Sequence, residues 1–169
     1  MLKFSPILSI TINQNDVTEQ QRSLINFMVE NNEKYTECDY LYIVNWTGAR
    51  NAWKNEKLNL EFNIRFDFLR NNWNDKKFHF FEDFRSSKEN LIMNPYEMFR
   101  IRGSSIPGSI TISFRSEQNI KHCRLHLDYD GLISFKYKNN QNLKFKLVKD
   151  LNEWFNNNCL NLESTSPLT

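Results

Sequence analysis

The residues of this chain that could carry out chemistry lie around Arg102, which precedes two serine hydroxyls, Ser104 and Ser105, in a predicted turn. Backbone N–H groups and hydroxyls in such a turn can surround an anion, while a guanidinium group offers two parallel charge-assisted hydrogen bonds. The combination outlines a cradle for a phosphate group. An ordinary hairpin with a surface arginine explains the same residues, and this stretch alone does not decide between the two.

Strand and turn signals from residue 78 onward predict the elements that would position this cradle. Four strands are expected, over residues 96–102, 109–115, 120–127 and 132–137. Short turns rich in Gly, Ser, Asn and Asp separate them, so we expect hairpins and an antiparallel sheet. A capping box of Ser86 and Glu89 predicts a short helix that ends near Asn94-Pro95, and an apolar stripe predicts a final helix over 146–157. The expected fold is α+β, with a central antiparallel sheet flanked by two helices.

Three motifs in this half of the chain resemble the Src-homology-2 (SH2) family. The stretch Phe99-Arg100-Ile101-Arg102, with its serines and Pro107-Gly108, is similar to the Phe-Leu-Val-Arg signature and the turn that follows it. Ile120–Leu125 is similar to the family's Lys-His-Tyr-Arg-Ile strand. The apolar residues that match its closing helix are Phe145, Val148, Leu151 and Phe155. The resemblance covers residues 78–169 and implies a phosphotyrosine-binding module.

The resemblance also implies roles for individual residues. Arg102 would form a bidentate pair with the phosphate, and Ser104 and Ser105 would donate hydrogen bonds to it. Arg124 would lie against the tyrosine ring. His122 would line the pocket floor, although a histidine that only holds neighbouring backbone fits the sequence at least as well. The remaining candidates for phosphotyrosine binding are Lys121, Arg85 and Arg100.

Two of these arginines depart from the family pattern. Arg85 is not a secure counterpart of the family's first-helix arginine, because Ser87 competes for that place. Arg100 shares a strand face with Arg102, so it either adds positive potential to the pocket or pairs at the surface with Glu89 or Glu97.

Two further departures concern the selectivity of the site. Cys123 replaces a tyrosine that in the family often touches residues following the phosphotyrosine, and residues 155–162 are short for the loop that normally walls the specificity pocket. We therefore expect binding centred on phosphotyrosine itself, with little selectivity for flanking sequence. Such binding resembles that of the SH2 domains found in some bacterial effectors.

The first 77 residues are predicted to form an N-terminal α+β extension of unknown role. Alternating apolar residues indicate a short strand at 8–12, and a capping box of Asp16 and Glu19 predicts an amphipathic helix that runs to about Glu30. Residues 40–44 are β-prone. Strict alternation favours a long strand over 58–68, with a helix across 56–73 as the rival.

Composition narrows the function classes. A net charge of +2 gives no global field for nucleic acid or a membrane, and single-stranded nucleic-acid binding rests only on 14% aromatic content. The three cysteines lack zinc-ligand or disulfide spacing, which indicates a reducing cytosol, or a host cytosol for a secreted effector. We expect a monomer that is not an enzyme, needs no cofactor and binds tyrosine-phosphorylated proteins or peptides. The alternative is an SH2-like scaffold that makes only protein–protein contacts through its N-terminal region.

Overall fold

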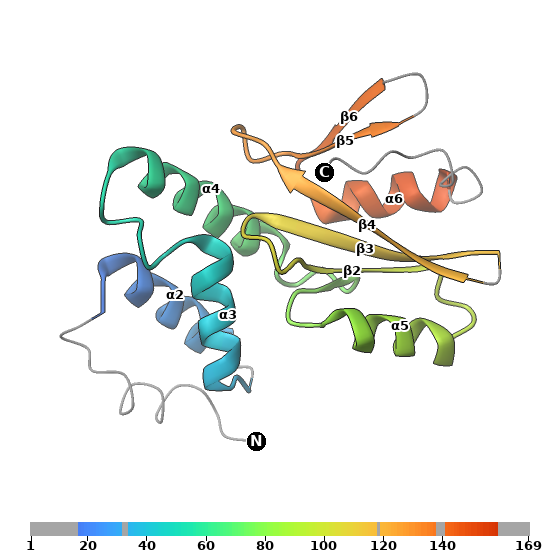
Figure 1. The fold of residues 1–169 in the computed structure, drawn as a ribbon, viewed down its shortest axis with the longest axis horizontal. Helices are drawn as coiled ribbons and strands as arrows, with labels where there is room; N and C mark the ends of the chain where they lie inside the picture. Colours follow the sequence, from blue (N-terminus) through green and yellow to red (C-terminus); the bar gives the residue numbers. More distant parts are fainter. Residues whose placement is uncertain (1–16, 32–33, 118, 138–140, 159–169) are drawn as a thin grey trace. The chain divides into compact units, whose positions relative to one another are not determined.

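The computed structural model describes residues 17–31, 34–117, 119–137 and 141–158 (Figure 1). The chain divides into two compact units, Met1–Phe66 and Asp67–Thr169. We refer to them as the N-terminal unit and the C-terminal unit. The predicted domain boundary, between residues 77 and 78, stays a prediction.

The first described element of the N-terminal unit is helix α2, Glu19–Glu30, in agreement with the amphipathic pattern. The helix starts later than predicted, because its capping box is formed by Thr18 and Gln21. The Gln21 N–H donates to Thr18 Oγ1 at 3.2 Å, and the Thr18 N–H donates to Gln21 Oε1 at 3.0 Å. The buried side chains of α2 are Leu24, Phe27 and Met28. The strand predicted at 8–12 lies outside the described residues.

The β-prone run predicted at 40–44 is wrong, because these residues lie in helix α3, Glu37–Thr47. A capping box of Thr36 and Asp39 starts the helix, and Gly48 ends it with a left-handed φ of 75°. The buried side chains are Tyr40, Ile43, Val44, Trp46 and Thr47. Their spacing follows the turns of a helix, so tertiary burial overrides the β preference of the individual residues.

The long strand predicted over 58–68 is also wrong, and the rival prediction of a helix is correct. Helix α4 spans Glu56–Asn72. Phe62, Phe66 and Leu69 are buried at helical spacing, whereas Leu60, which belongs to the same alternating series, is 57% exposed. The period of two in the sequence therefore does not correspond to a buried face.

The C-terminal unit contains a six-stranded sheet in the order β1-β2-β3-β4-β5-β6. The strands are β1 Phe78–His79, β2 Phe99–Gly103, β3 Ser109–Ser116, β4 Asn119–Leu127, β5 Ile133–Tyr137 and β6 Gln141–Phe145. Strand β1 pairs with β2 in parallel, and every other pair is antiparallel. The four predicted strands correspond to β2 to β5. The sequence analysis missed β1, which has only two residues, and β6.

The sheet has two faces, each covered by a helix. Helix α5, Phe84–Met93, and helix α6, Val148–Asn158, lie on opposite sides of strands β2 to β4 (Figure 1). The face toward α6 is apolar, and the ring of Phe99 lies 5.3 Å from that of Phe155. The sheet side chains buried on this face include Ile101, Ile110, Ile112, Phe114, Cys123 and Leu125. The arrangement confirms the predicted α+β fold with two flanking helices, preceded by a helical N-terminal region.

Both flanking helices begin differently from the prediction: α5 has a different N-terminal cap, and α6 begins at Val148 and not at residue 146. Helix α5 has Asp83 as its N-cap, with the Ser86 N–H donating to Asp83 Oδ1 at 2.7 Å, so the predicted capping box of Ser86 and Glu89 is wrong. Helix α5 ends at Met93 with Asn94 as its C-cap, in agreement with the end predicted near Asn94-Pro95. At the start of α6, the buried Val148 N–H donates to Asn72 Oδ1 at 2.8 Å.

Within the described residues, no helix combines the length and the apolar character needed to cross a membrane. No group of three or more His, Cys, Asp or Glu side chains in the same part of the chain is placed to hold a metal ion.

Candidate functional site

The register of the sheet places four of the eight candidate residues, Arg100, Arg102, His122 and Arg124, in two rows on one face. Arg102 of β2 is the partner of Thr111 of β3, which is the partner of Arg124 of β4. The adjacent row consists of Arg100, Ser113 and His122. Because cross-strand partners project on the same side of a sheet, these six side chains share the face that α5 covers.

Arg102 is half-buried at the end of β2. Its Nη1 donates to the backbone carbonyl of Gly103 at 3.4 Å, which is long for a hydrogen bond. Its guanidinium carbon lies 6.0 Å from the centroid of the Phe84 ring, at the first turn of α5. The guanidinium therefore lies between the end of a strand and the start of a helix.

Ser104 organises the turn that follows β2. Its side chain is buried, and its Oγ accepts hydrogen bonds from Arg124 Nε at 3.1 Å and from the Ile106 N–H at 3.3 Å. Ser105, in contrast, is exposed. The Ser104 hydroxyl thus connects the turn to the guanidinium of Arg124, whose side chain is otherwise exposed.

His122 lies beside Arg102 on this face. Its Nδ1 is 2.6 Å from Ser113 Oγ, and its ring centroid is 4.2 Å from that of Phe84. Its Nε2 is buried and has no hydrogen-bond partner among the described residues. Burial, together with the positive charges of Arg102 and Lys88, lowers the pKa of His122 below its ordinary value. The ring is therefore neutral near pH 7.

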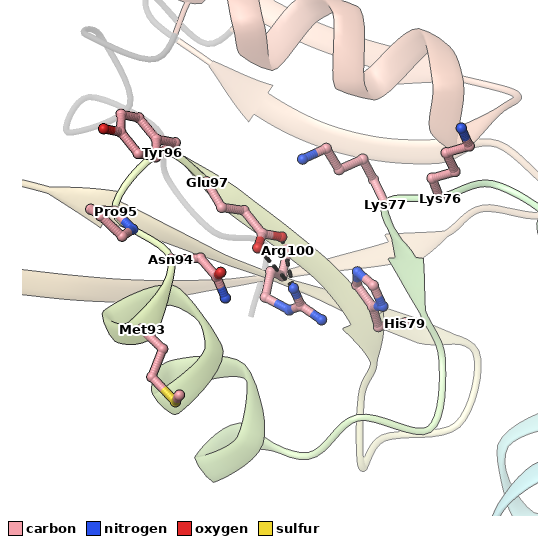
Figure 2. A pocket seen from close by; sticks show the side chains of 9 residues that line it. All are labelled: Lys76, Lys77, His79, Met93, Asn94, Pro95, Tyr96, Glu97 and Arg100. Atoms are coloured by element: carbon pink, nitrogen blue, oxygen red, sulfur yellow. Dashed lines mark hydrogen bonds and ion pairs between the residues drawn. The ribbon is translucent and has the colours of Figure 1, made fainter.

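Arg100 does not join Arg102. Its guanidinium binds Glu82 at 2.8 Å and Glu97 at 2.8 Å, and all three side chains are largely buried. Glu97, a predicted partner of Arg100, is therefore one of the two carboxylates that it binds. The ion pair is buried, whereas a pair at the surface was predicted. Arg100 and Glu97 line a pocket of about 730 Å³, whose lining also includes Lys76 and Lys77. Figure 2 shows these side chains, with the interactions between Arg100 and Glu97 as dashed lines.

Two other candidates also lie away from this group. The side chain of Arg85 is 86% exposed and pairs with Glu89 one turn further along α5, with Nε and Oε1 3.0 Å apart. Lys121 is the cross-strand partner of Phe114, so its side chain projects from the face opposite His122.

The segment that carries these residues matches a known protein family. Residues 80–155 match the SH2 domain. This segment belongs to the SH2 family. A search of curated proteins gave no match for the chain.

The SH2 segment contains α5, strands β2 to β6 and most of α6, and with them every candidate phosphotyrosine-binding residue. SH2 domains are modules for phosphotyrosine binding or protein–protein interaction, and they are not enzymes. The match thus assigns a general class of function to the segment.

Sequence reasoning missed three residues of this face of the SH2 segment. Ser113 lies between Arg100 and His122, and its Oγ is 2.6 Å from His122 Nδ1. Thr111 is 5% exposed and lies between Arg102 and Arg124. Alternation along β3 was sufficient to place Thr111 on the polar face, because its neighbours in sequence, Ile110 and Ile112, are apolar and project to the other face. Phe84 contacts both Arg102 and His122, and only the packing of α5 against the sheet reveals this.

Proposed function

We propose that the chain binds phosphotyrosine in phosphorylated proteins or peptides at the sheet face around Arg102. The observation that carries this proposal is the row Arg102, Thr111 and Arg124, in which two guanidinium groups flank a buried hydroxyl. A phosphoryl group carries about −1.5 to −2 charges at pH 7 and has three strong acceptor oxygens. A pair of arginines with nearby hydroxyls supplies the donors that such a group needs.

The two arginines have different roles in the proposed complex. Strands β2 and β4 are two strand spacings apart, about 9–10 Å, so Arg102 and Arg124 reach a ligand from opposite sides. The half-buried Arg102 supplies the bidentate pair to the phosphate. Arg124 is exposed and positioned by Ser104, so it is suited to lie against the tyrosine ring.

Polar groups beside Arg102 complete the proposed phosphate site. The buried Nε2 of His122 lacks a hydrogen-bond partner within the described residues, and a buried polar atom of this kind is normally satisfied by a ligand or by water. Ser105 is exposed in the turn, so its hydroxyl is accessible and can donate to a phosphate oxygen. Ser104, His122 and Ser105 therefore join the two arginines in the proposal.

The proposed site discriminates little among flanking sequences. Cys123 is 6% exposed in the apolar core, and burial raises the pKa of its thiol to about 11. A neutral, buried thiol offers no contact to the residues that follow phosphotyrosine. Phosphate and ring contacts therefore supply most of the affinity.

Calorimetric titration with a phosphotyrosine peptide tests the proposal. Arg102→Leu should weaken binding by at least about 30-fold, because the phosphate loses its bidentate partner. The matched control is Arg70→Leu, which removes an exposed arginine from α4 and should leave the affinity unchanged. Wild-type affinity in Arg102→Leu, with the fold intact by circular dichroism, would contradict the proposal.

The same titration separates this function from the alternative of an SH2-like scaffold. A scaffold that makes only protein–protein contacts would show no binding of the phosphopeptide even in the wild-type chain. The kinship with bacterial effectors, the cytosolic location and the monomeric state remain predictions of the sequence.

A further inference from the structure

Phe84 is a large apolar side chain that lies at the surface of the SH2 segment, beside the candidate site. Its ring contacts the guanidinium of Arg102 at 6.0 Å and the ring of His122 at 4.2 Å, yet the residue is 52% exposed. An aromatic ring that is packed on one side and open on the other can accept a second ring.

The start of helix α5 explains why Phe84 lies there. Asp83 caps the helix, so Phe84 is its first residue. Phe84, Ser87 and Leu91 follow one another at helical spacing, and the last two are fully buried against the sheet. Phe84 thus begins the sheet-facing stripe of α5 at the point where the sheet face becomes accessible to solvent.

The position of Phe84 matters for a phosphate ester that binds to Arg102. A phosphate held by Arg102 would place the group esterified to it near Phe84, because the ring lies against that guanidinium. An aryl ester presents a flat ring that can stack on or meet the edge of Phe84, whereas an alkyl ester or inorganic phosphate does not. Aromatic pairs contribute beyond the area they bury.

We propose that Phe84 is a specificity-determining residue that selects aryl phosphates over alkyl and inorganic phosphate. The inference rests on the proposed function, since it requires phosphate to bind at Arg102. It assigns the second wall of the ring site, opposite Arg124, to an aromatic side chain at the start of α5. Arg85, next in sequence, is 86% exposed and pairs with Glu89.

The test is an NMR titration of the full chain with phenyl phosphate, O-phosphoserine and inorganic phosphate. Phe84→Ala should weaken phenyl phosphate binding by about two- to twelvefold, while the affinities for the other two ligands stay within about twofold. Phe84→Leu keeps apolar bulk without an aromatic ring and should show a loss in the same direction. The control is Ile92→Ala, which truncates an exposed apolar side chain of the same helix and should change none of the three affinities.

Any one of the following results would overturn the inference. An unchanged preference for phenyl phosphate in both Phe84 variants would show that the ring does not contact the ligand. An equal loss for all three ligands would show that Phe84 only supports the helix. If the wild-type chain bound none of the ligands, the proposed function would be wrong, and the inference with it. If Arg102→Leu lost binding but Phe84→Ala did not, the inference alone would be wrong.

Discussion

Two arginines on the same face of β2 have different surroundings. Arg100 lies between the carboxylates of Glu82 and Glu97, with side-chain exposures of 12%, 10% and 16% respectively. Arg102, two residues later, lies against the Phe84 ring and the Gly103 carbonyl. Arg100 therefore stabilises the fold, because it binds Glu82 in the segment before α5 and Glu97 in the loop between α5 and β2. Arg102 is the candidate ligand-binding arginine.

Arg100→Leu should reduce the free energy of unfolding by about 3–5 kcal/mol, because it leaves two buried carboxylates without their cation. Urea denaturation followed by circular dichroism measures the change. The matched control is Arg85→Leu, which removes an exposed guanidinium from α5 and should change the stability by less than about 0.5 kcal/mol. Equal stabilities of the two variants would show that the buried ion pairs contribute nothing.

His122 should report both pH and ligand. Burial, Arg102 and Lys88 lower its pKa in the folded chain, whereas the unfolded chain takes up the proton near the ordinary value of 6.5. The unfolded state therefore binds more protons between these two values, and the contribution of His122 to stability is lost as the pH falls below about 6.5.

NMR titration of the His122 ring checks this account. Its pKa should lie below 6.5 in the free chain and rise when phenyl phosphate binds, because a nearby anion favours the charged imidazolium. Arg102→Leu should raise the pKa of free His122, since it removes a neighbouring positive charge. A free pKa at or above 6.5 would be inconsistent with the arrangement of His122 beside Arg102.

At the scale of elements, the junction between α4 and α6 depends on one buried amide. Asn72 is 3% exposed; its Oδ1 accepts from the Val148 N–H, and its Nδ2 donates to the Phe68 carbonyl at 2.8 Å. Asn72→Ala should lower the free energy of unfolding by about 1–3 kcal/mol, because a buried N–H group is left without a partner. The measurement is urea denaturation.

Asn71→Ala is the control for this junction, because Asn71 is an exposed neighbour in the same helix. It should leave the stability nearly unchanged. Comparable losses in the two variants would mean that helix propensity, and not the buried hydrogen bond, explains the effect.

The elements also show where sequence reasoning succeeds. Strands β2 to β5 were predictable because each is bounded by turn residues, and a shift of an end by up to three residues does not alter the pattern. Helix α4 was predicted as a strand, since its alternating residues satisfy a period of two and only tertiary burial of Phe62 and Phe66 reveals the helix. Strand β1 is too short to give any periodicity.

The candidate site was predictable only where sequence motifs identify its residues. The motif around Arg102 and the resemblance of residues 120–125 to the family's fourth strand assigned Ser104 and Arg124 to the same predicted site. The partner Glu82 of Arg100 and the ring of Phe84 could not be predicted in this way. Glu82 precedes α5 and is 18 residues from Arg100, and only the packing of that helix on the sheet brings them together.

At the scale of the whole molecule, the SH2 segment accounts for the proposed binding, and the role of the helical N-terminal unit stays unassigned. Because Cys123 is buried, the account predicts weak dependence on flanking sequence. Phosphopeptides with scrambled residues after the phosphotyrosine should differ in affinity by less than about tenfold. Fluorescence anisotropy with a small peptide set measures this. Differences far above tenfold would require a specificity pocket elsewhere in the chain.

In the proposed complex, the Arg102 guanidinium contacts the phosphate of an aryl phosphate ligand. Arginine side-chain ¹H–¹⁵N NMR spectra recorded during a phenyl phosphate titration test this contact directly. We expect large shifts for the Arg102 guanidinium and smaller shifts for Arg124, with Arg100 and Arg85 unchanged in their ion pairs. Saturable binding that leaves the Arg102 signals in place would contradict the proposed contact.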